Sequence, residues 1–176
     1  MVVLDSLRTE FSPRDNTPVF RFVSPLPNRE RPGRLINVIS VVCVYDDRET
    51  LEACLLQGLK AQMTECDLIL VDNTESRFKS AAQALNYGGG KARGNYVVFV
   101  HQDMVLGSEP SLNEIAKTLD QLPDLGIAGA AGCPEGTHGT LSNISHGTPP
   151  RPAGTAGTIT APMRVQTLDE CLTIVP

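Results

Sequence analysis

The sequence lacks three features that mark common protein classes: paired cysteines, long apolar runs and an excess of basic residues. Its five cysteines are scattered without a Cys-x-x-Cys pair, and their odd number suits neither a disulfide framework nor a zinc site. No apolar run approaches the ~20 residues that cross a bilayer, and the start MVVLDSLRTE carries an acidic residue where a signal peptide has basic ones. The net charge of −5 argues against nucleic-acid binding. We therefore expect a cytoplasmic protein with no nucleic-acid partner.

The length of 176 residues predicts a single domain with a hydrophobic core and leaves too few residues for two. Residues 1–34 are rich in Pro, Arg and Asn and have no sustained periodicity, which predicts a mobile or extended leader before a domain at residues 35–176. Three arginines near the end of this leader favour a solvated basic tether; the alternative is peripheral contact with an anionic membrane surface or partner. They are Arg29, Arg31 and Arg34.

Apolar runs rich in β-branched residues predict the main strands, and helical spacing predicts the segments between them. The alternation predicts an α/β fold with a mixed, mainly parallel sheet flanked by helices. The expected strands are 36–45, 66–73, 96–100, 127–132 and 163–175. The expected helices are 48–62, 76–85 and 109–122, with a breaker at 86–90 and a long loop at 133–161.

Polar residues follow the first three predicted strands where each strand ends. Asp46 and Asp47 follow the first strand, Asp72 closes the second, and the triplet His101-Gln102-Asp103 follows the third. Ligands bind beyond the carboxyl ends of strands in open α/β sheets, so we expect these groups to share one crevice. Such carboxylates suit a divalent cation and a hydroxyl-rich ligand such as a ribose or a sugar. The glycine run before the third strand is in the wrong place for a dinucleotide-binding loop, which follows a strand.

Four segments together resemble the nucleotide-binding half of family-2 glycosyltransferases, which have a GT-A-like, Rossmann-type fold. They are ISVVCVYDD, LILVDN, ALNYGGGKARGNY and VVFVHQDMVL. The chain is similar to a glycosyltransferase-like branch that has His-Gln-Asp in place of Asp-x-Asp, and the resemblance runs from about Ile36 to about Val175. It implies an enzyme that transfers a sugar with inversion. The donor would be a nucleotide-diphosphate sugar, and the acceptor a hydroxyl of a saccharide, a lipid or a protein.

The resemblance also implies two groups of site residues. The group that binds the nucleotide sugar comprises Val44, Tyr45, Asp46, Asp72, Lys91, Arg93 and Gln102. The metal group is Asp103 with His101, around a Mn²⁺ or Mg²⁺ ion that bridges the donor's diphosphate. Because an imidazole is a softer ligand than a carboxylate, His101 favours Mn²⁺; its alternatives are a hydrogen bond to a phosphate oxygen or a simple strand cap.

An inverting transferase needs a carboxylate base to deprotonate the acceptor hydroxyl. Asp169 is the candidate, with Glu170 beside it, and because relatives carry this base on a later helix we expect the chain to be short at its carboxyl end. This leaves a catalytically incomplete nucleotide-sugar binding module as one alternative. Another is a nucleotidyltransferase, which is disfavoured because the turn after the first strand, YDDRET, is not the expected Gly-rich, basic loop.

Overall fold

The computed structural model divides the chain into two compact units. The first unit comprises Met1–Arg29 and Leu122–Asp169, and the second comprises Glu30–Gln121 and Glu170–Pro176. No helix among the described residues has the length and apolarity that a membrane span requires. The described residues are 2–4, 7–11, 18–22, 39–62, 65–107, 110 and 112–176, with side chains described from residue 39 onward.

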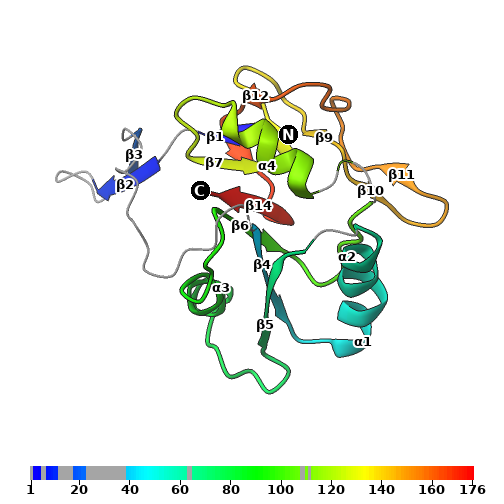
Figure 1. Ribbon diagram of the computed structural model, residues 1–176. Helices are drawn as coiled ribbons and strands as arrows, with labels where there is room; N and C mark the ends of the chain where they lie inside the picture. Colours follow the sequence, from blue (N-terminus) through cyan, green and yellow to red (C-terminus); the bar gives the residue numbers. More distant parts are fainter. Residues whose placement is uncertain are drawn as a thin grey trace. The chain divides into compact units, whose positions relative to one another are not determined.

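The second unit is built on strand β4, which pairs in parallel with β5 on one side and with β6 on the other. Strand β14 pairs with β6 in the antiparallel direction, so the sheet is mixed and partly parallel, and the predicted α/β class is confirmed (Figure 1). The elements in chain order are β4 (Ile39–Tyr45), α1 (Arg48–Leu51), the π-helical turn η1 (Glu52–Leu56), α2 (Gln57–Ala61), β5 (Asp67–Asp72), α3 (Ala81–Gly89), β6 (Tyr96–Val100), α4 (Leu112–Asp120) and β14 (Leu172–Val175).

Helices cover this sheet on both faces. Figure 1 shows α3 on one side of β4 and β5, and the continuous segment α1–η1–α2 on the opposite side. Val42 points toward α3 and belongs to a buried cluster with Ala92 and Val97. Because side chains alternate along a strand, Cys43 and Tyr45 point to the opposite face, on the side of α1–η1–α2. The two faces of the sheet therefore carry different side chains into different surroundings.

The strongest apolar runs fold as predicted. The run at 96–100 is β6, and the run at 36–45 contains β4, whose predicted start lies outside the described residues. The helical pattern at 48–62 becomes α1, η1 and α2, and Asp47 caps this segment by accepting from the amides of Glu49 and Thr50. Its buried side chains, Leu51 and Leu55, keep the predicted apolar spacing.

The prediction of a helix that stops at a breaker in 86–90 is wrong. Helix α3 begins after the N-cap residue Ser80 and continues through Gly88 and Gly89. These glycines let the helix approach the sheet: a Cβ on Gly88 would lie only 2.5 Å from Val42 Cγ1 and 3.0 Å from Val71 Cγ2. These glycines therefore allow close packing of the helix on the sheet. The sequence alone suggested the end of a helix, because glycine disfavours helices.

Strand β5 is more exposed than a strand that is covered on both faces. Leu68 and Leu70 remain 39% and 41% exposed, whereas Val71 is buried. Among the described strands, β5 pairs only with β4, so it lies at the border of the described sheet of this unit. The apolar run predicted the strand correctly but overestimated its burial.

The first unit consists of short strands around a small core of Ile159 and Val165. Strand β1 pairs with β7 and β12, β8 pairs with β9 and β13, and β2–β3 and β10–β11 form two further pairs. Their bounds are β1 (Val2–Leu4), β2 (Leu7–Phe11), β3 (Pro18–Phe22), β7 (Ile127–Gly129), β8 (Ala131–Cys133), β9 (Leu141–Ser142), β10 (Ser145–His146), β11 (Arg151–Pro152), β12 (Met163–Arg164) and β13 (Thr167–Leu168).

Two predicted strands are divided in the structure. The segment 127–132 contributes to β7 and β8, which pair with different partners, and 163–175 becomes β12, β13 and β14. Apolar residues alone do not reveal such breaks, because each piece contains only two to four residues. The division of the chain into a leader ending at residue 34 and one domain from residue 35 stays a prediction.

Replacing Gly88 with Ala tests the close approach of α3 to the sheet. The added methyl would meet two valine side chains, so we expect the free energy of unfolding to fall by about 1–3 kcal/mol, as for overpacked cores. Chemical denaturation measures this change. Gly90→Ala is the control, because its Cβ would meet no side chain and would lie 3.3 and 3.7 Å from the carbonyl oxygens of Asn86 and Tyr87. An equal loss in both variants would contradict the packing role.

Candidate functional site

The carboxyl ends of β4 and β5 meet through a direct hydrogen bond between side chains. Tyr45 and Asp72 are opposite each other in the parallel register, and the Tyr45 hydroxyl donates to Asp72 Oδ2 at 2.9 Å. The other oxygen, Oδ1, accepts from the amide and the hydroxyl of Thr74 at 2.9 and 2.7 Å. These bonds, those from Thr74 first, lower the pKa of Asp72, so this exposed carboxylate is ionised at neutral pH.

The carboxamide of Gln102 joins the end of β6 to the end of β4. Its Oε1 accepts from the amides of Asp46 and Asp47 at 3.0 and 3.1 Å, and its Nε2 donates to Asp46 Oδ1 at 2.6 Å. Sequence reasoning placed Gln102 among the donor-binding residues. These hydrogen bonds align two strand ends, and a role of Gln102 in donor binding stays a prediction.

Asp103 lies in the turn after β6 with its side chain exposed. Its charge contributes to raising the pKa of the buried Cys43 thiol to about 12, although burial itself is the larger cause. Asp103 directly follows Gln102, whose carboxamide is bonded to Asp46 and Asp47 beyond the end of β4. Asp46, Asp72 and Asp103 thus lie at the carboxyl ends of three adjacent strands, and a common ligand site stays a prediction. We call these residues, with Tyr45 and Gln102, the carboxyl rim.

The segment after Asp103 is held against α2. A Cβ on Gly58 would lie 2.5 Å from the Leu106 amide nitrogen, so only glycine permits this approach. The buried side chain of Gln62 donates to the Gly107 carbonyl oxygen, and its Oε1 accepts from the Leu112 amide at 2.8 Å. These contacts fix the chain on the far side of the turn that carries Asp103. No sequence motif indicated the roles of Gly58 and Gln62, because both look like ordinary residues of a helix.

Arg48 is a charged neighbour of the rim that sequence reasoning missed. Its guanidinium donates to Glu52 Oε1 at 2.9 Å, and this bond, together with the charge of Glu52, raises the pKa of Arg48. Tyr45 and Asp72 also contribute to the raised pKa of this exposed cation, which follows the rim residue Asp46 by two positions. The helical pattern showed Arg48 only as a charged residue in the first turn of a helix, which predicts an ordinary surface position.

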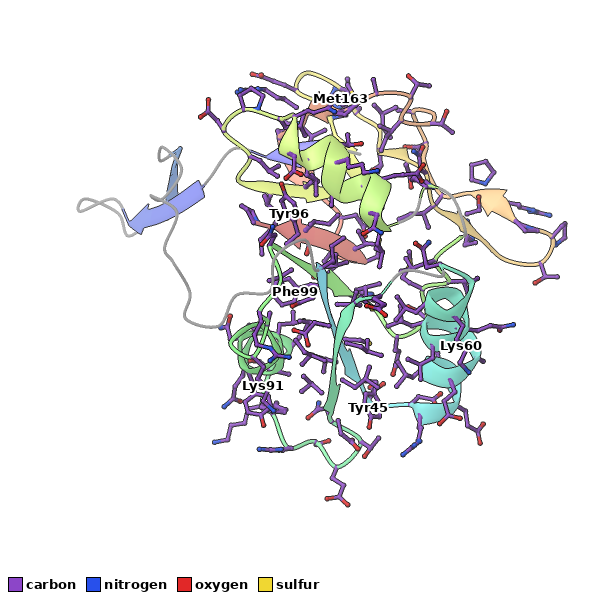
Figure 2. The ribbon with its side chains drawn as sticks, viewed as in Figure 1. Tyr45, Lys60, Lys91, Tyr96, Phe99 and Met163 are labelled. Atoms are coloured by element: carbon purple, nitrogen blue, oxygen red, sulfur yellow. The ribbon has the colours of Figure 1, made fainter. Side chains whose placement is uncertain are left out.

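Three predicted donor-binding residues lie away from the rim. Val44 alternates with Tyr45 and points toward α3. Lys91 follows α3 and places its ammonium 4.2 Å from the Tyr87 ring centroid, and Figure 2 shows Lys91 and Tyr45 on different sides of β4 and β5. Arg93 lies at the amino ends of the strands, with its guanidinium 3.5 Å from the Asp67 carboxylate. Proximity to a strand in sequence did not determine which end or face each residue occupies.

Backbone hydrogen bonds place His101 and Asp169 in their own units. The His101 amide donates to the Cys171 carbonyl oxygen at 3.0 Å, and its imidazole is exposed. Asp169 belongs to the first unit, where its amide donates to the Ala131 carbonyl oxygen at 3.0 Å. Within the described residues, no group of three or more His, Cys, Asp or Glu side chains is arranged to hold a metal ion. A metal ion at the rim would thus be coordinated by one or two protein side chains and by oxygen atoms of the bound donor.

Comparison with known proteins identifies one related family. A sequence model described as a glycosyltransferase-like family matches residues 39–143, more than half of the 176 residues. The matched residues include β4, β5, β6 and the whole carboxyl rim. A search of curated proteins gave no match.

We predict that Gln102→Met loosens the two strand ends. The substitution keeps the length of the side chain but leaves the Asp46 and Asp47 amides without their side-chain acceptor. Because these hydrogen bonds are exposed to solvent, the loss should be about 0.5–1.5 kcal/mol. Hydrogen exchange at these amides should accelerate, while exchange in the middle of β4 is unchanged. Gln57→Met is the control, since Gln57 is exposed on α2. Unchanged protection in Gln102→Met would rule out the alignment role.

We also predict that the pKa of Asp72 depends on Thr74 and Tyr45. Thr74→Val and Tyr45→Phe each remove a hydroxyl that stabilises the carboxylate, so each should raise the pKa of Asp72. A depressed carboxyl pKa stabilises the fold above the pKa of the unfolded chain, and this contribution is lost as pH falls through the folded-state pKa. Both variants should therefore lose less stability on acidification. Carbon-detected NMR titration of Asp72 measures the shift; an unmoved pKa would contradict the assigned cause.

Proposed function

The chain belongs to the glycosyltransferase-like family, and from this membership we propose that it transfers a sugar from a nucleotide-diphosphate donor to a hydroxyl acceptor with inversion. The observation that carries the proposal is the carboxyl rim. Hydrogen bonds join the ends of β4, β5 and β6 there, and acidic side chains from all of them lie at one edge. Ligands of open α/β sheets bind at such an edge.

Asp72 is the proposed contact for the ribose or the nucleobase of the donor. Its carboxylate is exposed and its pKa is depressed, so it accepts hydrogen bonds from ligand hydroxyl or N–H groups at neutral pH. Tyr45 and Thr74 hold both of its oxygens in place. The donor therefore meets a carboxylate whose orientation is already set, which lowers the entropic cost of binding.

The donor set of the rim fits a hard divalent cation of the Mn²⁺ or Mg²⁺ type. Such ions often take only one or two protein carboxylates and complete their coordination with phosphate oxygens and water. Asp103 is the proposed protein ligand, with His101 beside it in the same turn as the second. When bound, the ion would supply Lewis-acid stabilisation of the charge that develops on the departing nucleoside diphosphate.

The acceptor hydroxyl must lose a proton, and Asp169 remains the proposed base. It lies in the first unit and outside the residues that match the family. This observation favours a second candidate function, a module that binds the nucleotide sugar without transferring it. The two functions share the donor site and differ only in turnover.

Titration with UDP- and GDP-sugars, with and without Mn²⁺, tests donor binding by calorimetry. We expect Mn²⁺-dependent binding that Asp103→Asn weakens at least about tenfold, or ~1.4 kcal/mol. Asp124→Asn is the control, because Asp124 is an exposed acid of the first unit and its φ of 58° also suits Asn. Phosphorus NMR then measures whether nucleoside diphosphate is released. Release indicates a transferase, and binding without release indicates a binding module.

Two outcomes would count against these assignments. Undiminished Mn²⁺-dependent binding by Asp103→Asn would remove Asp103 from the metal site. Failure of every UDP- and GDP-sugar to bind, while the variant and wild-type proteins remain folded, would exclude both the transferase and the binding module.

A further inference from the structure

A cavity of about 380 Å³ lies in the second unit, at the amino ends of the strands. Its floor includes the first residues of two neighbouring strands, Ile39 of β4 and Tyr96 of β6. The remaining wall comes mainly from α4, in which the lining residues recur at helical spacing and so share one face. They are Asn113, Ala116, Lys117 and Asp120. Leu112 and Leu119 of the same helix are buried, so α4 turns its polar face to the cavity.

This cavity is separate from the carboxyl rim. Ile39 begins β4 and Tyr45 ends it, and a rise of about 3.3 Å per residue puts roughly 20 Å between them. A single small ligand cannot reach both ends of the strand. The cavity also lies at the edge opposite to the one where ligands of α/β sheets usually bind, so the proposed transfer reaction makes no use of it.

The lining indicates a ligand that is polar but carries no net charge. Among the described lining residues, Lys117 and Asp120 contribute one charge of each sign, and Asn95 and Asn113 contribute carboxamides that both donate and accept. The Tyr96 hydroxyl donates to Asp120 Oδ1 at 2.7 Å, which fixes this carboxylate. Hydroxyl groups also donate and accept, so they match such a set. Ile39 and Ala116 add apolar surface suited to the C–H face of a ring.

We propose that this cavity binds a neutral, polyhydroxylated small molecule of the saccharide class. Its volume falls within the range of about 300–1,000 Å³ that small-ligand sites occupy. The site is independent of the donor site and of any metal, because none of its lining residues belongs to the carboxyl rim.

Two-dimensional amide NMR with methyl glycosides of glucose, galactose, mannose and N-acetylglucosamine tests this site. At sugar concentrations up to about 10 mM, a Kd near 1 mM gives close to full occupancy. We expect at least one glycoside to shift the amides of residues 95–96 and 113–120 and to leave those of the rim unchanged. Glucuronic acid and glucosamine, which carry a net charge, should bind more weakly than their neutral counterparts.

Variants locate the binding. Asn113→Ala should weaken it at least about tenfold by removing a carboxamide, and Ala116→Phe should abolish it by filling the space. Gln121→Ala removes a carboxamide from an exposed position of the same region that does not line the cavity, and it should bind as the wild type does. Thermal unfolding confirms that each variant is folded.

The absence of shifts with every glycoside would overturn the proposal, as would shifts confined to the rim or full affinity in Asn113→Ala. Because donor binding is measured separately with nucleotide sugars and Mn²⁺, failure at the cavity leaves the proposed function intact. Failure of donor binding likewise leaves the cavity proposal in place.

Discussion

The carboxyl rim depends on one side chain, the carboxamide of Gln102. Parallel strands that end side by side leave their last amides without partners in the sheet, and each such group costs free energy if nothing satisfies it. Gln102 accepts from two of these amides beyond β4 and donates to the Asp46 carboxylate. The same residue sits between His101 and Asp103. Alignment of the strand ends therefore also fixes the turn that carries the proposed metal ligand.

The sequence predicted the strands of the second unit well because their apolar runs are long and their ends are polar. Tyr96–Val100 was predicted to its exact bounds, and the polar residues that follow β4, β5 and β6 were expected at one edge. Burial of β5 could not be predicted, since a run such as LILV reads the same whether a further strand covers its edge or not. Gly88 and Gly89 misled for a related reason. A glycine that breaks a helix and one that lets a helix touch a sheet have the same local signature.

Only some of the predicted site residues lie at the rim, and the alternation of side chains along the strands explains which of them do. Tyr45 and Asp72 point to one face of the sheet, and Val44 points to the other. Lys91 lies against Tyr87 of α3, which covers the Val44 face. The position of a residue in the sequence predicts at which end of a strand it lies. The face of the sheet to which its side chain points depends on how that strand is aligned with its neighbours. Arg48 escaped notice for a different reason: it lies in the first turn of a helix that begins directly after the rim, and the helical pattern predicted only a surface charge there.

Electrostatics at the rim connect the geometry to the proposed chemistry. The described rim presents the carboxylates of Asp46, Asp72 and Asp103, and Arg48, whose charge contributes to the lowered pKa of Asp72, is already bonded to Glu52. A donor diphosphate is itself strongly negative and would be repelled by such a surface. Lys91 and Arg93 do not offset this repulsion, since they lie beside α3 and at the amino ends of the strands. A divalent cation held by Asp103 would reverse the sign of the interaction. Within the proposed function, metal dependence thus follows from the charges that the fold brings together, without reference to any motif.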